Sequence, residues 1–249
     1  MIEAVVRDRR LRWPIDKRFE SSVRHQTVRR IERRAKYILI GFDSGTAIVH
    51  LGMSGSLRML KAGTAPRPHD HWDLVLDSGQ VLRFHDPRRF GSLLWVVGDP
   101  LEHPLLAKLA PEPLSAAFDP DYLHKATRKR SVAIKHLIMN SQIVVGVGNI
   151  YASEALFRAR ISPRRAAHRI TREESKALVR AIQEVLSEAI EIGGTTLRDY
   201  VNAEGTPGYF AQKLYVYERS KQPCRVCKTP IRQFTQGQRS TYWCATCQR

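Results

Sequence analysis

The sequence is poor in acidic residues and has no long apolar run. Its 249 residues hold 24 Asp and Glu against 41 Lys and Arg, which gives a formal net charge of +17 and a pI near 10.2. Such a charge attracts a polyphosphate backbone from a distance, so nucleic acid is the expected partner rather than a small neutral metabolite. The lack of a long apolar run, a signal-peptide core or a basic amphipathic anchor argues against a membrane protein. The expected location is the cytosol or nucleoid.

Cysteine is also scarce, and the four present form two Cys-x-x-Cys pairs: Cys224, Cys227, Cys244 and Cys247. Four thiolates at this spacing can close a tetrahedron around one zinc ion, because each pair forms a tight turn and the intervening residues can form a hairpin. The alternative is two disulfides, which require an oxidising compartment and are typical of small secreted scaffolds. The pattern favours a structural Zn²⁺ site in a zinc ribbon.

The positive charge is concentrated at the two ends of the chain. Residues 1–36 hold twelve Lys and Arg against five acids, and residues 213–249 hold eight against one. We interpret the ends as two basic jaws of a clamp around nucleic acid, although a basic terminus is often only a solvated face. With 43% hydrophobic residues the chain can form real cores, and its length allows two domains or one domain with appendages.

The first part of the chain alternates short apolar runs with turn signals. Asp43-Ser44-Gly45 and Asp77-Ser78-Gly79 are typical hairpin punctuation, and no helical period of useful length intervenes. The pattern predicts an antiparallel β-sandwich or barrel. The expected strands are Glu3 to Arg7, Val28 to Arg33, Ala35 to Phe42, Thr46 to Met53, Ser56 to Leu60, Trp72 to Leu76, Val81 to His85 and Ser92 to Val97.

Repeated prolines between Pro100 and Pro113 mark a domain boundary, and helical patterns follow it. Thr171 and Glu174 form a capping box before a run that ends at Gly193-Gly194. Two shorter helices are expected after the N-cap candidates Asp119 and Ser131. The core-facing residues expected in the second short helix and in the long run are Val132, Ile134, Leu137 and Ile138, then Leu178, Ile182, Val185, Leu186 and Ala189.

A glycine-rich turn, Val144-Val145-Gly146-Val147-Gly148-Asn149, precedes a helix that runs to about Arg160. Two glycines before an Asn cap let the free N–H groups of the helix start point at an anion such as a DNA phosphate. A plain helix-to-helix turn is the alternative, because one glycine-rich turn is weak evidence by itself.

Several motifs together resemble the formamidopyrimidine-DNA glycosylase family, which is related to endonuclease VIII. The matches follow family order from the first strand to the last residue and include the four cysteines. They are Arg-Arg-Ala-Lys-Tyr at 33–37, His-Leu-Gly-Met-Ser-Gly at 50–55, His-Asp-His at 69–71, Asp-Pro-Arg-Arg-Phe-Gly at 86–91, Val-Gly-Val-Gly-Asn-Ile-Tyr-Ala-Ser-Glu at 145–154, Gly-Gly-Thr-Thr-Leu at 193–197 and Pro-Gly-Tyr-Phe at 207–210. The last two are more similar to the branch that acts on oxidised purines.

The resemblance implies an α+β multidomain chain: a β-sandwich at 1–105, a helix-two-turns-helix domain at 112–205 and a four-cysteine zinc ribbon at 213–249. It implies base-excision repair by a glycosylase and abasic-site lyase that flips 8-oxoguanine or formamidopyrimidine out of duplex DNA, in a bacterial cytosol, as a monomer. Alternatives are a noncatalytic relative that binds damaged DNA, an endonuclease VIII-like glycosylase for oxidised pyrimidines, and a zinc-ribbon nucleic-acid binder without a role in damage.

The resemblance also assigns residues. Met53, Arg88 and Phe90 would enter the duplex in place of the flipped nucleotide, and Lys36 and Arg239 would serve the elimination chemistry. Alternation with Tyr37 and Ile38 would place Lys36 on one strand face. The expected DNA-contacting set is Met53, His69, Arg88, Phe90, Arg130, Lys135, Asn149 and Arg239. Glu154 is interpreted as a helix or support residue rather than a general acid.

One departure from the family concerns the nucleophile. Family members begin with Pro-Glu, whose proline amine forms a Schiff base with the sugar, whereas this sequence begins Met-Ile-Glu. The motif Arg-Leu-Arg-Trp-Pro at 10–14 falls into family order only if a whole N-terminal helix is missing. Glu3 therefore does not match the family glutamate, and no residue is assigned as the nucleophile. A start site chosen too late and a real truncation both explain this. We favour the first, and expect the chain as written to be inactive and marginal in stability and an extended form to be active.

Overall fold

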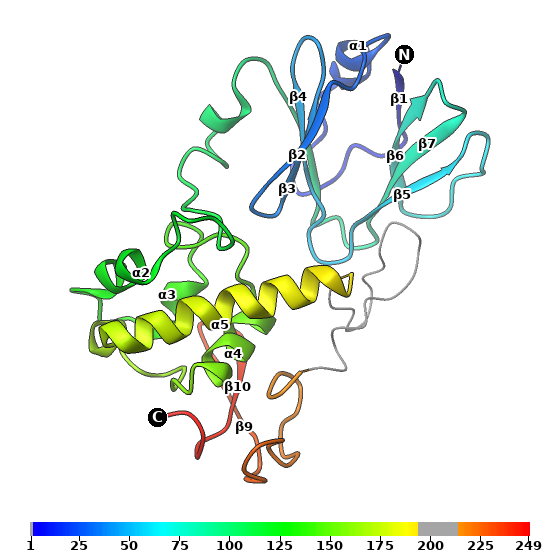
Figure 1. The fold of residues 1–249 in the computed structure, drawn as a ribbon. Helices are drawn as coiled ribbons and strands as arrows, with labels where there is room; N and C mark the ends of the chain where they lie inside the picture. The colour runs from blue at the N-terminus through cyan, green and yellow to red at the C-terminus, as the bar shows by residue number, and fades with distance from the viewer. Residues whose placement is uncertain (1, 194–213) are drawn as a thin grey trace. The chain divides into compact units, whose positions relative to one another are not determined.

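The computed structural model describes residues 2–193 and 214–249, which fall into two compact units (Figure 1). The first extends to Ala107; the second comprises Lys108–Ile192 and the described C-terminal residues. Each has its own buried apolar cluster. The Gly-Gly-Thr-Thr-Leu motif beyond its first glycine, and the Pro-Gly-Tyr-Phe motif, lie outside the described residues.

The first unit is a sandwich of two four-stranded antiparallel sheets, which confirms the predicted fold class (Figure 1). One sheet has the order β1-β6-β7-β5 and the other β2-β3-β4-β8. All the expected strands are present, with ends that differ slightly from the prediction. Their bounds are β1 Ile2–Val6, β2 Arg30–Arg34, β3 Tyr37–Gly41, β4 Thr46–His50, β5 Ser56–Lys61, β6 Asp70–Leu76, β7 Gln80–His85 and β8 Ser92–Val96.

The core of this unit lies between the two sheets. Trp72 and Phe84 stack at 5.3 Å between ring centroids in one sheet, and Val49 and Leu93 are buried in the other. One short helix, α1 (Phe19–Val23), was not expected from the sequence, because five residues are too few to show a helical period. Its two apolar ends are buried in the same cluster. A 3-10 turn, η1 (Pro100–Glu102), follows the last strand.

The described residues of the second unit form four helices: α2 (Pro120–Thr127), α3 (Ile134–Ile138), α4 (Asn149–Arg158) and α5 (Arg172–Glu191), with the 3-10 turn η2 (Ala167–Arg169) before the last. Two predicted caps are confirmed. Asp119 accepts a hydrogen bond from the Tyr122 N–H, and Thr171 and Glu174 form the reciprocal capping box. No helix in the described part of the chain is long and apolar enough to cross a membrane.

Helix α3 begins later than predicted. Its N-cap is Ala133, without a side-chain cap, so the assignment of Ser131 as the cap is wrong. The preceding backbone is tied instead to residues 165–167, through Ile134 N–H to the Arg165 carbonyl at 2.8 Å and Ala167 N–H to the Val132 carbonyl at 2.9 Å. Val132 is consequently 49% exposed rather than in the core, whereas the other predicted apolar residues of α3 and α5 are buried.

The ribbon of the second unit is the hairpin of β9 (Arg232–Gln236) and β10 (Arg239–Trp243). Gln236 pairs with Arg239, and the two turn residues, Gly237 and Gln238, both have positive φ, 54° and 59°. This is the type I′ geometry that matches the twist of the flanking strands. The turn therefore places Arg239 at the tip.

Candidate zinc centre and nucleic-acid interface

The four cysteine sulfurs converge in the second unit. All four Sγ atoms lie within 4.8 Å of one another, with Cys224 and Cys247 at 4.0 Å and Cys227 and Cys244 at 3.3 Å. Zn–S bonds of about 2.3 Å in a tetrahedron separate the sulfurs by about 3.8 Å, so the spacing fits one zinc ion. With four sulfurs the coordination is closed, so the chain has a site for one structural zinc and no position for a metal-bound water.

The ribbon also packs on helix α4 and the loop after it. Gln248 donates from its Nε2 to the Ile161 carbonyl at 2.9 Å, and its Oε1 accepts from the Cys244 N–H at 2.9 Å. The buried Glu154 carboxylate accepts backbone N–H bonds of 2.8–3.0 Å from Tyr215, Val216 and Tyr217. Burial raises the pKa of Glu154, and the three donors oppose that shift. These contacts fit the support role expected for Glu154.

Two further candidates, Lys135 and Asn149, also face the ribbon. Lys135 is 1% exposed, and its Nζ donates to Thr241 Oγ1 at 2.7 Å and to the Ser240 carbonyl at 3.3 Å. Asn149 Nδ2 donates to the same carbonyl at 3.0 Å and to the Tyr217 hydroxyl at 3.3 Å. Both side chains therefore hold strand β10 next to Arg239, which is itself exposed.

The start of α4 differs from the predicted cap. Gly148 is the N-cap, with no side-chain cap, and Asn149 is the first helical residue, so its assignment as the cap is wrong. The Asn149 side chain is drawn to Ser240 instead, which leaves the helix start capped by glycine alone. Arg130 is exposed elsewhere in this unit, and its backbone carbonyl accepts from the His168 N–H at 2.9 Å.

In the first unit, Met53, Arg88 and Phe90 lie on two loops that touch. Met53 is 66% and Phe90 44% exposed, and the Arg88 guanidinium carbon lies 4.7 Å from the Phe90 ring centroid. Gly52 has φ +68°, and a Cβ there would lie 2.6 Å from the Phe90 backbone carbon. Only glycine allows this approach, so the two loops present their exposed side chains together.

A buried carboxylate ties these two loops to each other. Asp86, fully buried, accepts from Ser54 Oγ at 2.6 Å and from the Gly91 N–H at 2.8 Å. Its backbone carbonyl bonds His71 Nε2 at 2.8 Å, and its own N–H donates to the His69 carbonyl at 3.0 Å. Asp86 thus links the segments that carry Met53, His69 and Phe90. This role of Asp86 was not predicted from the sequence, because functions were assigned only to Arg88 and Phe90 in the motif at 86–91.

Lys36 lies in a turn and not in the predicted strand. Strand β3 begins at Tyr37, which pairs with Arg34, and Ala35 has a left-handed φ of 54°, a turn conformation. The strand-alternation argument for Lys36 is therefore wrong. The positive charge of Lys36 nevertheless affects His50. Burial is the main cause of the lowered pKa of His50, and the charges of Lys36 and Arg12 lower it further.

His50 supports the Met53 loop in its neutral form. Its Nδ1 accepts a hydrogen bond from the Gly52 N–H at 2.9 Å, which requires an unprotonated nitrogen. The lowered pKa keeps the ring neutral at physiological pH, so the electrostatics and the hydrogen bond agree.

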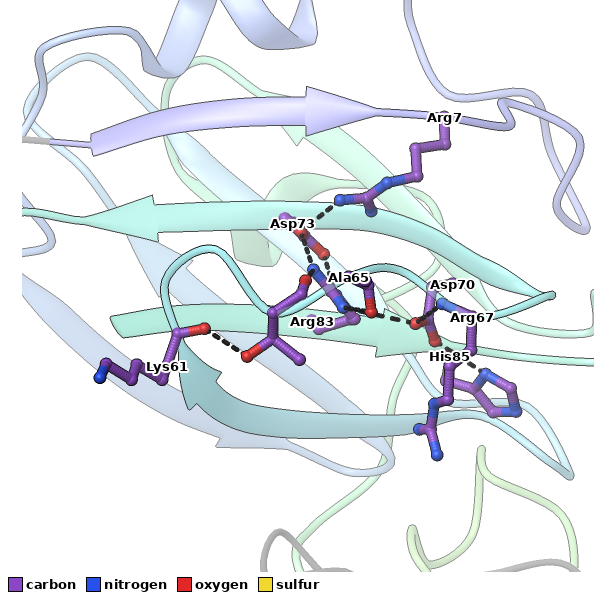
Figure 2. Close-up of polar contacts among 9 residues, drawn as sticks. Arg7, Lys61, Ala65, Arg67, Asp70, Asp73, Arg83 and His85 are labelled. Atoms are coloured by element: carbon purple, nitrogen blue, oxygen red, sulfur yellow. Dashed lines mark hydrogen bonds and ion pairs between the residues drawn. The ribbon is translucent and has the colours of Figure 1, made fainter. Parts of the chain in front are cut away.

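His69 ends the loop between β5 and β6, in a left-handed conformation with φ 71°. Figure 2 shows the polar network that holds this loop. Arg83 donates to both oxygens of Asp73 at 2.9 and 2.8 Å and to the carbonyls of Thr64 and Ala65 at 2.9 and 3.1 Å. Asp70 accepts from His85 Nδ1 at 2.9 Å and from the Arg67 N–H at 2.8 Å. These hydrogen bonds hold the loop near both of its ends, and His69, its last residue, is exposed.

Three family models match the chain. They are the formamidopyrimidine-DNA glycosylase N-terminal domain at residues 1–93, the formamidopyrimidine-DNA glycosylase H2TH domain at 109–201, and the zinc finger found in FPG and IleRS at 221–249. A formamidopyrimidine-DNA glycosylase of Thioalkalivibrio sulfidiphilus is 57% identical over 98% of this chain and 90% of its own length. One of Methylococcus capsulatus is 53% identical over 100% and 92%.

Solved structures show the same likeness. The MutM (Fpg) protein of Thermus thermophilus superimposes with a TM-score of 0.86 at 39% identity, covering 99% of this chain and 90% of that one. The Fpg of Lactococcus lactis in complex with DNA containing an abasic site gives 0.91 at 27% identity, with 99% and 91% coverage.

Proposed function

Because the chain belongs to the formamidopyrimidine-DNA glycosylase family, we propose that it acts in base-excision repair, excising oxidised purines from duplex DNA and cleaving the abasic site. The observation that carries this is the 57% identity to a formamidopyrimidine-DNA glycosylase over 98% of the chain. The cytosol or nucleoid of a bacterium is the proposed location. Residues 1–105, 112–205 and 213–249 are the proposed domains.

The proposed roles follow the geometry of each unit. Met53 and Phe90 are exposed apolar side chains on joined loops, which suits insertion between bases, and Arg88 beside them can donate to the orphaned base. His69, Arg130 and Arg239 are exposed cations or donors suited to phosphates. Lys36 is proposed to assist the elimination chemistry near the lesion, and Arg239 to assist the second elimination by binding the phosphates that flank the flipped nucleotide. Zinc, held by the four cysteines, supplies rigidity to the ribbon and no chemistry.

The test measures binding and covalent trapping separately. The 249-residue chain, and the same chain extended by an N-terminal helix that begins Pro-Glu, are incubated with duplexes that carry 8-oxoguanine, formamidopyrimidine, an abasic-site analogue or no lesion. We expect both proteins to prefer the lesion duplexes, and borohydride to trap an adduct only with the proline start. Equal affinity for damaged and undamaged duplex contradicts the proposed function. A trapped adduct from the 249-residue chain contradicts the view that none of its residues is the nucleophile.

A further inference from the structure

Lys135 is a cation that cannot reach a phosphate as the second unit is folded. Lys135 is 1% exposed, and its ammonium donates hydrogen bonds to Thr241 Oγ1 and to the Ser240 carbonyl. A phosphate contact needs a solvent-facing donor, as the exposed Arg239 provides. A buried ammonium destabilises the fold unless it gains hydrogen bonds, so the hydrogen-bond partners of Lys135 indicate what the residue does.

Both partners of Lys135 belong to β10 and directly follow Arg239. Thr241 is 0% exposed and accepts at 2.7 Å, so the contact is fully shielded from solvent. Asn149 binds the Ser240 carbonyl from α4 at 3.0 Å, so one carbonyl receives donors from two helices. The backbone immediately after Arg239 is therefore held in one position.

The other side of the hairpin tip is held by shape. A Cβ at Gly237 would lie 2.6 Å from His136 Nε2, so the turn backbone rests on the imidazole of the residue after Lys135. The tip that carries Arg239 thus contacts α3 both through the turn and through β10. A change at this contact alters where the guanidinium points.

The two cations also interact through space. The pKa of Lys135 is lowered to about 8, first by burial and then by the positive charge of Arg239. Like charges repel, so the buried ammonium favours an Arg239 side chain that extends away from the protein body. No described residue pairs with the Arg239 guanidinium, which leaves its donors for a ligand.

We propose that Lys135 is a positioning residue for DNA binding: its buried ammonium fastens β10 beside Arg239 and directs that guanidinium toward a DNA phosphate, without touching the DNA itself. The inference rests on the proposed function, because duplex DNA is the ligand. It reassigns Lys135 from the contacting set to the frame of the ribbon. Asn149 shares the task through the same carbonyl.

The test is a double-mutant cycle on binding of the zinc-loaded protein to an abasic-analogue duplex and to the undamaged duplex. The variants are Lys135→Met, Thr241→Val, Arg239→Gln and the two doubles with Arg239→Gln. We expect Lys135→Met to weaken binding about tenfold, the loss of one charge-assisted contact, and Thr241→Val to weaken it less. In the Arg239→Gln background both changes should have little further effect, because they act through Arg239.

The salt dependence gives a second readout. A direct phosphate contact contributes about 0.9 to the slope of log K against log salt, so Arg239→Gln should lower the slope by that amount. Adding Lys135→Met to Arg239→Gln should leave the slope unchanged. Lys176→Met, which removes an exposed lysine of α5, is the matched control for loss of one charge.

Two outcomes overturn the proposal. The first is that Lys135→Met and Arg239→Gln weaken DNA binding additively and that the double variant has a lower salt slope than Arg239→Gln. That result would mean that Lys135 contacts DNA directly. The other is an unchanged affinity of Thr241→Val, since a buried hydroxyl can affect DNA only through the frame. The zinc content and melting temperature of each variant show whether a loss of DNA affinity results from unfolding. Should the parent protein bind both duplexes equally, the proposed function fails while the cycle on the undamaged duplex still decides the role of Lys135.

Discussion

At the residue scale, His50 couples proton binding to the loop that carries Met53. Its Nδ1 accepts from the Gly52 N–H, and burial with the charges of Lys36 and Arg12 lowers its pKa. The unfolded chain then binds a proton more readily than the folded one. The stability that neutral His50 contributes is present above the unfolded pKa of about 6.5 and is lost as the pH falls through the lower folded pKa.

We therefore expect the free energy of unfolding to fall between about pH 7.5 and pH 5 by more in the parent protein than in His50→Asn, whose amide oxygen can accept from Gly52 without titrating. Urea unfolding across that range measures the difference. Parallel curves for the two proteins would show that His50 does not titrate on folding.

A second prediction concerns Gly237. Alanine there adopts an unfavourable left-handed φ and its Cβ meets His136 at 2.6 Å, so the hairpin tip must move. We expect Gly237→Ala to lose about 1 to 3 kcal/mol of stability and to weaken DNA binding while zinc stays bound. Gly63, which has φ +83° and open space around its Cβ position, is the matched control for strain without a clash. Binding by Gly237→Ala that equals that of Gly63→Ala would rule out the contact as a determinant of tip position.

At the element scale, buried polar residues hold the loops on which the candidate DNA contacts lie. Arg83 joins β6, β7 and the loop before His69, and removing it leaves Asp73 and Asp70 buried with fewer partners (Figure 2). We expect Arg83→Met to cost about 3 to 5 kcal/mol in urea unfolding. Arg180→Met breaks an exposed pair with Glu184 on α5 and should change stability by less than about 0.5 kcal/mol. Similar losses in both variants would contradict the importance of burial.

Asp86 is the corresponding hub between the Met53 and Phe90 loops. Asp86→Ala removes the acceptor for Ser54 and the Gly91 N–H, so we expect a loss of about 2 to 4 kcal/mol and faster proteolysis in both loops. Asp121→Ala, at an exposed carboxylate in α2, serves as the control. If cleavage quickens in only one loop, Asp86 does not couple them.

The elements that sequence reasoning located were those with a repeating pattern. Strand alternation, the capping box at Thr171 and the cysteine spacing each reflect a local rule, and each is present. The sequence did not predict helix α1 or the true start of α3, because tertiary contacts determine both. Helix α1 packs into the core, and the start of α3 is set by hydrogen bonds to the backbone of 165–167. The sequence places Lys135 in the expected DNA-contacting set for the same reason, because no local signal indicates that Thr241 will cover its ammonium.

At the scale of the whole molecule, the zinc site stabilises one part of the chain. All four ligands lie in the second unit, and the ribbon core includes the buried Cys224 and Cys244. Chelation should release one zinc per chain, melt the ribbon and weaken lesion binding about tenfold or more through loss of the proposed Arg239 contact. The first unit, which holds no zinc ligand among its described residues, should keep its thermal transition. Calorimetry with and without chelator measures this, and loss of both transitions would contradict it.

In the joined loops of the first unit, the residues that shape the loops are distinct from the residues proposed to contact DNA. Gly52, Ser54, Asp86 and Gly91 shape the loops from within, whereas Met53 and Phe90 project outward and make little of the core. Substitutions at the two projecting positions can therefore accumulate without exhausting the stability of the domain. If the two side chains enter the duplex as proposed, a randomised library at these two codons is a direct route to altered damage specificity.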